Sequence, residues 1–317
     1  MLAILIFPYI IAGSKKNPGG FDFAGDFFRF NDFKIKTMYN GNVVDIPLKE
    51  YIYGSVAAEI LPNSPREAIK AQSAAIFSYT ISRMNLKESH PDTFPEHGEA
   101  YICNDPSHCK AYITKDEAYL KWGREYFNNY WNYMTSCVDE VVGKVITFEG
   151  KVIDAVFFCC SNGRTEDCEN VWGSEAPYLK SVDSNFDENC SAYLSTAEFD
   201  ENELKRLIKE TEPEFDIDIL ADEIFLNIQK SENDYVLNIT AGEMEISGQK
   251  IRKALSLRST SFSVEYKDGV FYFTVKGYGH GVGMSQNGAV YLARTGMGYE
   301  EILKYYYTGI TIEDYIL

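Results

Sequence analysis

The sequence is short of basic residues. Its 30 Lys and Arg are outnumbered by 47 Asp and Glu, so the 317-residue chain carries a formal net charge of −17. Binding to a nucleic-acid backbone depends on clustered Lys and Arg, and the sequence contains no basic stripe. We therefore expect no DNA or RNA among the partners of this protein.

A long hydrophobic run is lacking as well. The apolar run at the amino terminus extends only from Leu2 to Ile11 and contains Pro8, whereas a helix that spans a bilayer needs about 20 apolar residues. Basic residues do not precede this run as they do in a signal peptide. We interpret residues 1–20 as the remnant of a membrane anchor with its linker, which predicts an extracytoplasmic, membrane-anchored protein. An amino-terminal strand or a disordered end is the alternative.

The cysteines do not follow the spacing of a small disulfide-stabilised domain. There are seven of them, and an odd number cannot all pair within one chain. At least one is therefore free, oxidised with a partner or bound to a metal. Cys159 and Cys160 are adjacent on a predicted strand, where neighbouring side chains point to opposite faces, and we interpret them as packing residues.

Internal repeats and a regular alternation of strands and helices are also absent. Three tight-turn dipeptides instead separate runs of strand-forming residues: Asn40-Gly41, Glu149-Gly150 and Asp268-Gly269. Each predicts a β-hairpin, because Gly and Asn tolerate the positive φ angles of such turns.

Helices are predicted between the hairpins. Ser64 with Glu67 three residues later has the spacing of a capping box, and Asp200 is expected to cap the helix that follows it. Residues 86–135 are expected to be irregular. The mixture predicts an α+β fold in which helices pack with β-hairpins and small mixed sheets in two coupled lobes.

One ionisable residue interrupts the most apolar part of a predicted helix. The stretch VAAEILP places Glu59 near the end of a helix that begins at about Leu48 and stops before Pro62. On a 3.6-residue period Glu59 shares the apolar face of Leu48 and Ile52. Burial and the carbonyl-rich end of the helix both disfavour a carboxylate, so we expect a carboxyl group that stays protonated near neutral pH, as a general acid requires. The alternative is that Glu59 reaches solvent or pairs with a lysine such as Lys70.

Three stretches occur in a distinctive order: YIYGSVAAEILPNSPREAIKAQSAAIFSYT, FFCCSNGRTEDCENVWGSEAPYLKSVDS and GYGHGVGMSQNGA. Together they resemble the stage II sporulation protein D family, also called the SpoIID/LytB domain family. The resemblance covers about residues 46–307, and GHGVGMSQNGA is its most specific part. It implies one catalytic domain over residues 21–317, with variable insertions near 86–135 and 195–255 and a glycan-binding cleft.

The resemblance implies a peptidoglycan lytic transglycosylase that acts during spore engulfment on glycan strands stripped of their stem peptides. The family's catalytic glutamate falls on Glu59. It would protonate the oxygen between N-acetylmuramic acid and N-acetylglucosamine and then deprotonate the muramic C6 hydroxyl, which leaves a 1,6-anhydro end. The implied partners are glycan strands, the amidase stage II sporulation protein P, and stage II sporulation protein M. The implied location is the space between the mother-cell and forespore membranes.

The glycine-rich loop GYGHGVG is a candidate sugar-binding element. Its glycines do not have the spacing of a dinucleotide fingerprint, and they indicate close backbone approach and unusual φ angles. His280 can equally be a structural histidine, and Ser285 can be a helix cap. The residues that we predict to bind substrate are Tyr278, His280, Ser285 and Gln286, together with Thr165 and Glu166 of the SNGRTE stretch.

Two positions depart from the family's pattern. Asn162 replaces a glycine in SNGRTE, which is a mild change because Asn tolerates left-handed conformations. Phe77 stands where the family has an arginine, so the contact that this arginine makes in relatives is in doubt in this chain.

His97, Cys103 and Cys109 are each separated by five residues, in a loop that also contains His108. Zinc accepts such ligands, and three of them would leave one coordination position open. Ordinary loop cysteines or a disulfide are the alternatives. The resemblance to clostridial-type members of the family implies a zinc site near the cleft, and we therefore expect a metal that shapes the binding groove and takes no part in the cleavage.

Two other functions fit the same residues. One is a non-catalytic glycan-binding enhancer of a cell-wall amidase, in which Glu59 only forms a hydrogen bond to the glycan. The other is a zinc hydrolase that uses the His97 cluster. Aromatic residues suited to stacking on sugar rings are Trp172, Tyr178, Tyr278 and the run Tyr305–Tyr307.

Overall fold

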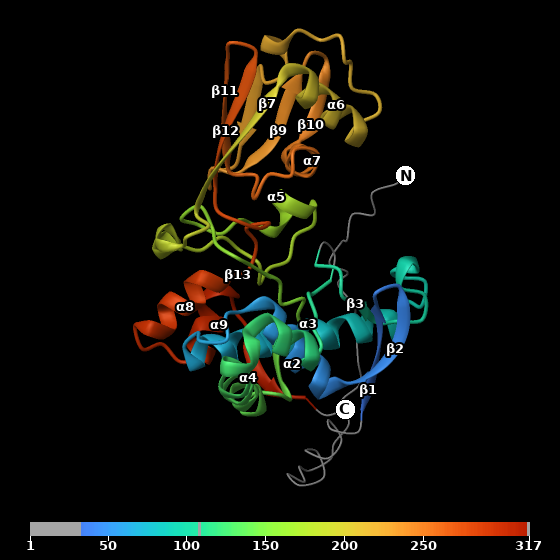
Figure 1. The fold of residues 1–317 in the computed structure, drawn as a ribbon, viewed down its shortest axis with the longest axis vertical. Helices are drawn as coiled ribbons and strands as arrows, with labels where there is room; N and C mark the ends of the chain where they lie inside the picture. Colours follow the sequence, from blue (N-terminus) through green and yellow to red (C-terminus); the bar gives the residue numbers. More distant parts are fainter. Residues whose placement is uncertain (1–32, 107–108, 316–317) are drawn as a thin grey trace. The chain divides into compact units, whose positions relative to one another are not determined.

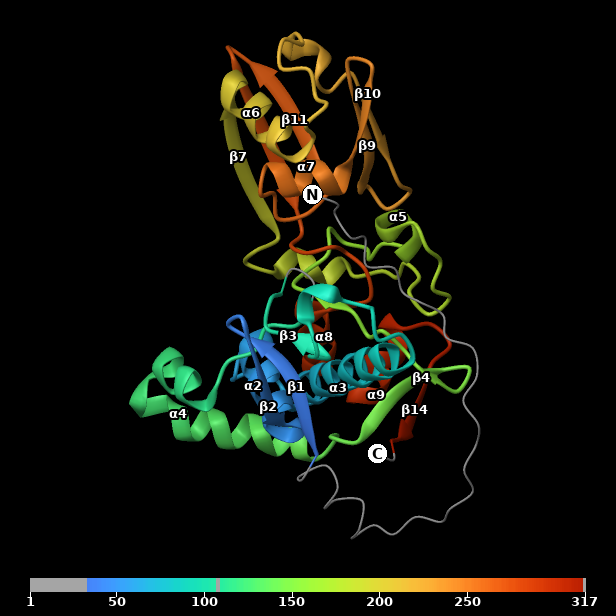
Figure 2. The same ribbon diagram turned by 90° about the vertical axis from the view of Figure 1, so that its right-hand side faces the viewer.

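The computed structural model describes residues 33–106 and 109–315 (Figures 1 and 2). The predicted anchor at residues 1–20 lies outside this part of the chain. Among the described residues, no helix combines the length and apolarity that crossing a membrane requires. The described residues divide into two compact units: one comprises those up to Val156 and those from Leu292 onward, and the other comprises Phe157–Tyr291. Both mix helices with small sheets, so the predicted α+β class is confirmed.

The first unit is built around the long helix α3 (Arg66–Ser89). Helices α2 (Leu48–Glu59), α4 (Lys115–Asp139) and α9 (Tyr299–Tyr306) contact it, as does strand β4 (Lys144–Phe148) (Figure 2). Small side chains on α3 let these elements approach closely. The fully buried alanines of α3 are Ala68, Ala71, Ala74 and Ala75.

Two three-stranded sheets complete this unit, in the orders β2-β1-β3 and β14-β4-β5. The hairpin turns at Asn40-Gly41 and Glu149-Gly150 are confirmed, and all four residues have positive φ. Strand β3 adds to the first sheet in parallel with β1. The remaining elements of the unit are β1 (Lys34–Tyr39), β2 (Asn42–Pro47), the 3-10 helix η1 (Pro95–His97), β3 (Ile102–Cys103), β5 (Lys151–Val152) and β14 (Thr311–Asp314).

The second unit contains the sheets β10-β9-β8 and β11-β12-β7 and the short parallel pair β13-β6. Its elements are β6 (Phe157–Phe158), α5 (Cys168–Trp172), η2 (Asn185–Asn189), β7 (Leu194–Asp200), α6 (Glu201–Thr211), η3 (Ala221–Glu223), β8 (Asn227–Lys230), β9 (Val236–Ala241), β10 (Met244–Ser247), α7 (Gly248–Ala254), β11 (Phe262–Lys267), β12 (Val270–Lys276) and β13 (Met284–Ser285). Helix α8 (Gln286–Arg294) includes residues of both units.

Aromatic packing organises the larger part of this second unit. Phe262, Phe271 and Phe273 are nearly fully buried in one cluster with residues of α6 and α7. The predicted hairpin at Asp268-Gly269 joins β11 to β12 and is confirmed. The cap of α6 is confirmed as well, because Asp200 Oδ1 accepts a hydrogen bond from the Glu203 N–H at 2.9 Å.

Residues 86–135 are not irregular, which corrects the prediction. They include most of α4, a helix that begins with a capping box between Thr114 and Glu117. Gly123, with φ 76°, interrupts the helical geometry and divides α4 into two segments. This interruption and the many aromatic residues conceal the helical periodicity.

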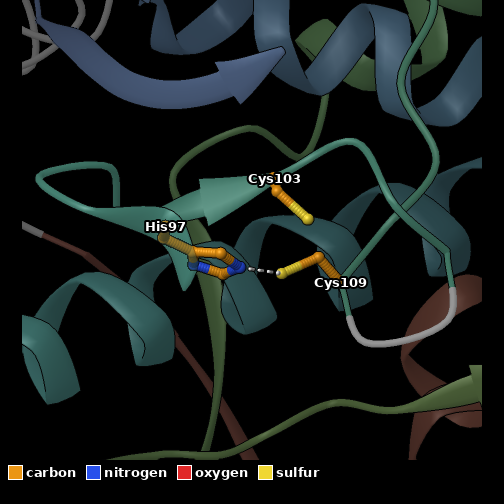
Figure 3. Close-up of side chains that lie close together, drawn as sticks. All are labelled: His97, Cys103 and Cys109. Atoms are coloured by element: carbon orange, nitrogen blue, oxygen red, sulfur yellow. Dashed lines mark hydrogen bonds between the residues drawn. The ribbon is translucent and has the colours of Figure 1, made fainter. Parts of the chain in front are cut away.

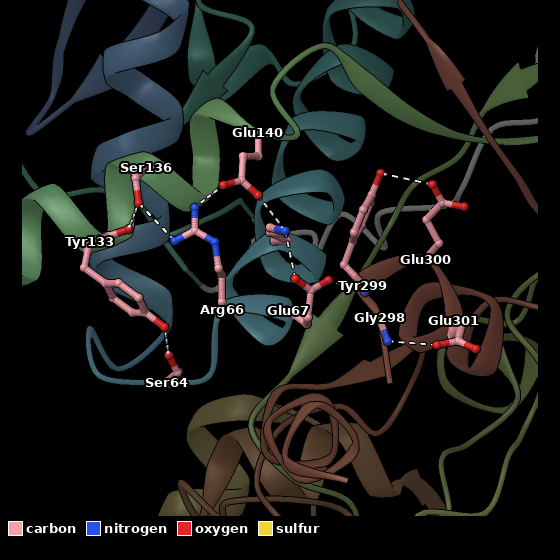
Figure 4. A network of polar contacts seen from close by, with 11 residues as sticks. Ser64, Arg66, Glu67, Tyr133, Ser136, Glu140, Gly298, Tyr299, Glu300 and Glu301 are labelled. Atoms are coloured by element: carbon pink, nitrogen blue, oxygen red, sulfur yellow. Dashed lines mark hydrogen bonds and ion pairs between the residues drawn. The ribbon is translucent and has the colours of Figure 1, made fainter. Parts of the chain in front are cut away.

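The predicted capping box of α3 is also wrong. Pro65 occupies the cap position, and no side chain there accepts a hydrogen bond. Glu67 instead binds Lys70 and accepts a hydrogen bond from the Tyr299 N–H at 2.9 Å (Figure 4). Glu67 therefore fixes the start of α9 against α3, which is a tertiary role.

Candidate functional site

Glu59 is the last residue of α2. Ile60 leaves the helix in an extended conformation, with φ −123° and ψ 150°. The helix buries Leu48 and Ile52 completely, as the 3.6-residue pattern predicts. Glu59 itself is only half-buried, so the expectation of an acid buried among apolar side chains is wrong. Because α2 ends at this residue, the carboxylate lies at the edge of the core.

The loop before α4 contacts Glu59. The N–H of Ala111 donates to Glu59 Oε1 at 2.9 Å. Lys110, the preceding residue, is only 6% exposed, and burial lowers its pKa to about 8 while the negative charge of Glu59 opposes this lowering. The alternative pairing with Lys70 is wrong, because Lys70 forms ion pairs with Glu67 and Glu140 instead.

The surroundings of Lys110 explain how a cation is accommodated in the core. Its Nζ lies 4.3 Å from the centre of the Tyr79 ring, where the ring face attracts positive charge. Arg83 and Asp154 form a buried ion pair of 3.1 Å in the same region. No sequence signal singles out Lys110, because it lies in a loop without periodicity and 51 residues beyond Glu59.

His97, Cys103 and Cys109 come together as predicted (Figure 3). All three are buried, and their ligand atoms lie within 4.8 Å of one another. Cys109 Sγ is 3.6 Å from His97 Nε2, and Cys103 Sγ accepts a hydrogen bond from the Asp105 N–H at 3.2 Å. A hydrogen bond to Cys109, together with burial, raises the pKa of the Cys103 thiol.

This cluster and the acid belong to one local structure. Cys109 directly precedes Lys110 and Ala111, the two residues beside Glu59. The same loop also packs tightly on α2: a Cβ at Gly54 would lie 2.3 Å from the carbonyl oxygen of Ile113, so only glycine fits there. Any ligand that orders the cluster would therefore also fix the partners of Glu59.

The ion pairs of Figure 4 hold the segment that follows Glu59. At the start of α3, Arg66 pairs with Glu140, and Lys70 pairs with both Glu67 and Glu140. Hydrogen bonds from Arg66 and Lys70 lower the pKa of Glu140 to about 2. These contacts tie the amino-terminal end of α3 to the carboxyl-terminal end of α4.

The glycine-rich loop belongs to the second unit. Gly277, Gly279, Gly281 and Gly283 all have positive φ, which confirms the predicted unusual backbone. A Cβ on Gly279 would lie 2.5 Å from Phe158 Cβ, so the predicted close approach is confirmed as well.

His280 is half-buried and bonded to backbone at both ring nitrogens. Nε2 is 3.1 Å from the carbonyl oxygen of Phe157, and Nδ1 is 3.1 Å from the N of Val282. With Nε2 as donor and Nδ1 as acceptor, both contacts describe a neutral ring. The ring lies 5.1 Å from that of Trp172. These contacts give His280 a structural role beside any contact to sugar.

Three of the predicted substrate-binding residues are fully buried. Ser285 Oγ donates to Asp187 Oδ1 at 2.8 Å and accepts from the Gly288 N–H at 3.0 Å, so it caps α8. Thr165 Oγ1 accepts from the Val182 N–H. Glu166 accepts hydrogen bonds from the side chains of Asn170 and Asn233. Their side chains therefore support the loops of this unit from within.

The remaining predicted sugar contacts differ in exposure. Tyr278 is 45% exposed, with the Arg258 guanidinium 5.4 Å from its ring centre, and Gln286 is half-buried. Tyr306 and Tyr307 are fully buried, so their predicted stacking on sugar is wrong. They form part of the core, with the Tyr307 hydroxyl donating to the Val156 carbonyl at 2.8 Å.

The two departures from the family pattern have structural explanations. Asn162 donates through Nδ2 to Asn233 O and Ser261 Oγ, so it acts as a cross-link, and the positive φ falls on Gly163. Phe77 is fully buried and fills the core beside Tyr315.

Comparison with known proteins identifies the family. The profile described as SpoIID, Stage II sporulation protein, matches residues 38–148, which contain Glu59 and the His97 cluster. Stage II sporulation protein D of Bacillus amyloliquefaciens is 34% identical over 287 residues, which cover 87% of this chain and 76% of that protein. Stage II sporulation protein D of Bacillus subtilis (strain 168) is 31% identical over 275 residues, 87% and 77% of the two chains. A Bacillus subtilis (strain 168) protein named Amidase enhancer is 25% identical over 312 residues, 83% and 40% of the two chains.

These similarities define a sporulation protein with an α+β fold. More narrowly, the chain belongs to the stage II sporulation protein D family, and the family assignment made from its three sequence stretches is confirmed.

Proposed function

We propose that this protein degrades the cell wall as a peptidoglycan lytic transglycosylase, with Glu59 as its single general acid and base. The setting of Glu59 carries the proposal. Its carboxylate is partly exposed, is fixed by the Ala111 N–H and has the cation of Lys110 nearby. A half-buried acid that is held in one orientation can both reach a substrate and exchange a proton with it.

The reaction requires one carboxyl group in two roles. Protonated Glu59 donates its proton to the glycosidic oxygen as the bond from that oxygen to muramic C1 breaks. The resulting carboxylate then takes the proton of the muramic C6 hydroxyl while O6 bonds to C1. Glu59 ends protonated, as it began, and no water is consumed.

Lys110 suits the intermediate state of this cycle. After the first proton transfer Glu59 carries a full negative charge, which the Ala111 N–H and the Lys110 ammonium group both stabilise. A positive charge fixed in a buried site acts more strongly on this carboxylate than an exposed one would.

Zinc is the metal that we propose for His97, Cys103 and Cys109. The residues fit, since a buried set of one imidazole and two thiols with ligand atoms within 4.8 Å of one another suits tetrahedral zinc. Bound there, zinc would supply a rigid junction and leave the proton transfers to Glu59. Cys109 would then hold Lys110 and Ala111 in place.

Family membership supports a wider proposal for substrate, location and partners. The substrate would be glycan strands without stem peptides, and the protein would act outside the cytoplasm, attached to the membrane by its amino-terminal segment. Stage II sporulation proteins P and M would be its partners. Sugar would contact the accessible residues of the second unit, namely Tyr278, His280 and Gln286, while the buried ones maintain the loops: Thr165, Glu166 and Ser285.

Mass spectrometry of digested glycan strands tests the proposed reaction. Purified strands without stem peptides are incubated with wild type, Glu59→Gln and Glu50→Gln, the last being an exposed acid of the same helix. We expect 1,6-anhydro ends from wild type and Glu50→Gln and a loss of about 10²–10⁴-fold with Glu59→Gln. Hydrated reducing ends would indicate a hydrolase instead, and equal activity of Glu59→Gln would exclude Glu59 as the acid.

A second candidate function follows from the similarity to the protein named Amidase enhancer. In this case the protein would bind glycan and stimulate an amidase without cleaving the strand. The Glu59→Gln variant separates the two functions. If the protein only binds glycan, Glu59→Gln and wild type should stimulate the amidase equally, and neither of them should produce 1,6-anhydro ends.

A further inference from the structure

A second group of cysteines meets in the second unit, far along the chain from the His97 cluster. Cys159 and Cys160 follow strand β6, and Cys190 follows the 3-10 helix η2. Their three sulfur atoms lie within 4.8 Å of one another. The prediction that Cys159 and Cys160 point to opposite faces is therefore wrong, because β6 ends at Phe158 and the chain no longer has the alternation of a strand.

The separation of the sulfur atoms suits a metal ion. Zinc–thiolate bonds of about 2.3 Å in a tetrahedral site place sulfur atoms about 3.8 Å apart, so small side-chain rotations would bring all three into coordination. A disulfide would use two of the three and leave one sulfur over. Cys160 is 1% exposed while Cys159 and Cys190 are half-buried, so one side of the cluster is open to an incoming ion and to a fourth ligand.

A backbone contact to sulfur is shared by the two cysteine clusters. The Ala192 N–H forms a hydrogen bond with the sulfur of Cys190, as the Asp105 N–H donates to Cys103 Sγ at 3.2 Å. Hydrogen bonds to the ligand atoms orient the ligands of metal sites.

Backbone hydrogen bonds hold the two cysteine segments in register without using the thiols. The Asn287 N–H donates to the Cys159 carbonyl at 3.0 Å, and Cys160 exchanges two backbone hydrogen bonds with Tyr278. The Cys190 N–H donates to the carbonyl of Asp187 at 2.9 Å.

The Asp187 carboxylate is already occupied. Its oxygens accept hydrogen bonds from Ser161, Ser184 and Ser285, among others. It is therefore a structural centre of these loops and is not positioned to serve as a metal ligand. The sulfur atoms of Cys159, Cys160 and Cys190 are therefore the metal ligands that this site offers, and the surrounding hydrogen bonds hold them in place.

We propose that Cys159, Cys160 and Cys190 form a second metal site, which binds zinc through three thiolates. The fourth coordination position faces the half-buried side of the cluster. The bound ion joins the end of β6 to the loop after η2, next to the segment that carries the glycine-rich loop. This site does not depend on the proposed glycan cleavage and is distinct from the His97 cluster.

Metal stoichiometry tests the site directly. The full chain is purified without oxygen in a phosphine reductant, in a Cys103→Ser/Cys109→Ser background that removes the first cluster. Zinc per chain is measured by mass spectrometry after dialysis, and Co²⁺ serves as a second probe through its thiolate charge-transfer absorption. We expect one equivalent in this background, and at least a 100-fold loss of affinity when Cys190→Ser is added. Cys137→Ser, at a buried cysteine outside both clusters, should leave binding unchanged.

Two results would overturn the proposal. One is that the Cys103→Ser/Cys109→Ser protein, with the remaining thiols reduced, takes up no zinc and shows no cobalt–thiolate absorption. The other is a disulfide among the three cysteines that persists when the protein is isolated with zinc present. Should Cys190→Ser not fold, Cys159→Ser at a partly exposed position replaces it. Zinc should also protect Cys159 in wild type from alkylation, and unchanged alkylation would count against the site.

Discussion

Replacing Lys110 with methionine should stabilise the protein and slow its proposed reaction. Lys110 is 6% exposed, and methionine is a flexible apolar side chain that fills a similar volume. A buried lysine whose pKa is lowered by burial pays free energy to remain charged. The variant avoids this cost, but it also removes the cation beside Glu59.

The pKa gives the size of the effect. Lys110 has a pKa of about 8, against an ordinary value of 10.5, and at about 1.4 kcal/mol per pKa unit the difference corresponds to about 3 kcal/mol. The folded state binds this proton more weakly than the unfolded chain does. Wild type should therefore gain stability as the pH rises from about 8 towards 10.5, and lose that contribution as the pH falls through about 8. Near pH 7, Lys110→Met should be more stable than wild type by up to about 3 kcal/mol.

Urea unfolding near pH 7 and near pH 10 measures both parts of this expectation. The advantage of Lys110→Met should be largest near pH 7 and should shrink near pH 10. Lys304→Met, whose side chain is 53% exposed, is the matched control and should change stability by less than about 0.5 kcal/mol. A Lys110→Met protein that is less stable than wild type near pH 7 would refute the reasoning, because it would show that the ammonium group stabilises the fold.

Three further changes test other parts of the structure. Gly279→Ala should lower the free energy of unfolding in urea by about 2–4 kcal/mol, since φ is +121° and the new Cβ would lie 2.5 Å from Phe158 Cβ. An unchanged midpoint of the urea transition would contradict this backbone conformation at Gly279. Glu140→Gln should cost less than about 1 kcal/mol because its ion pair with Arg66 is exposed. Because the pKa of Glu140 is about 2, the contribution of this ion pair to stability should be present above about pH 4.5 and be lost as the pH falls towards 2. A larger loss of stability in Glu140→Gln at neutral pH would show that the ion pair is buried. Cys109→Ser should slow glycan cleavage about 10–100-fold by loosening the loop beside the acid; full activity in a metal-free variant would exclude that role.

Local signals in the sequence predicted the elements that depend on neighbouring residues. The turns at Asn40-Gly41 and Asp268-Gly269 need only the backbone preferences of their own residues, and Asp200 caps the helix that begins at the next residue by accepting from an N–H three residues away. The same holds for α2, whose end at Glu59 follows from its pattern and from Pro62. These predictions are correct because the physics that fixes them acts over a few residues.

Contacts between distant residues could not be predicted in the same way. Glu67 has the spacing of a capping box, but its carboxylate accepts a hydrogen bond from the Tyr299 N–H, 232 residues away. Lys110 and Ala111 reach Glu59 only after the chain has folded back from β3. The His97 cluster was predicted because its ligand types suggested a metal, whereas Cys190 carried no such signal for Cys159 and Cys160.

The first unit takes residues from two separate stretches of the chain, and this fixes an order of folding. Strand β14 pairs with β4, and α9 packs on α3, so the unit cannot close until residues 299–314 have been made. The second unit is continuous from Phe157 to Tyr291 and can complete its contacts earlier, since contiguous domains fold as they emerge. Until then, the surfaces of α3 and β4 that later contact α9 and β14 stay uncovered. These uncovered surfaces make the stage before residues 299–314 are added the one at which the chain is most prone to aggregate.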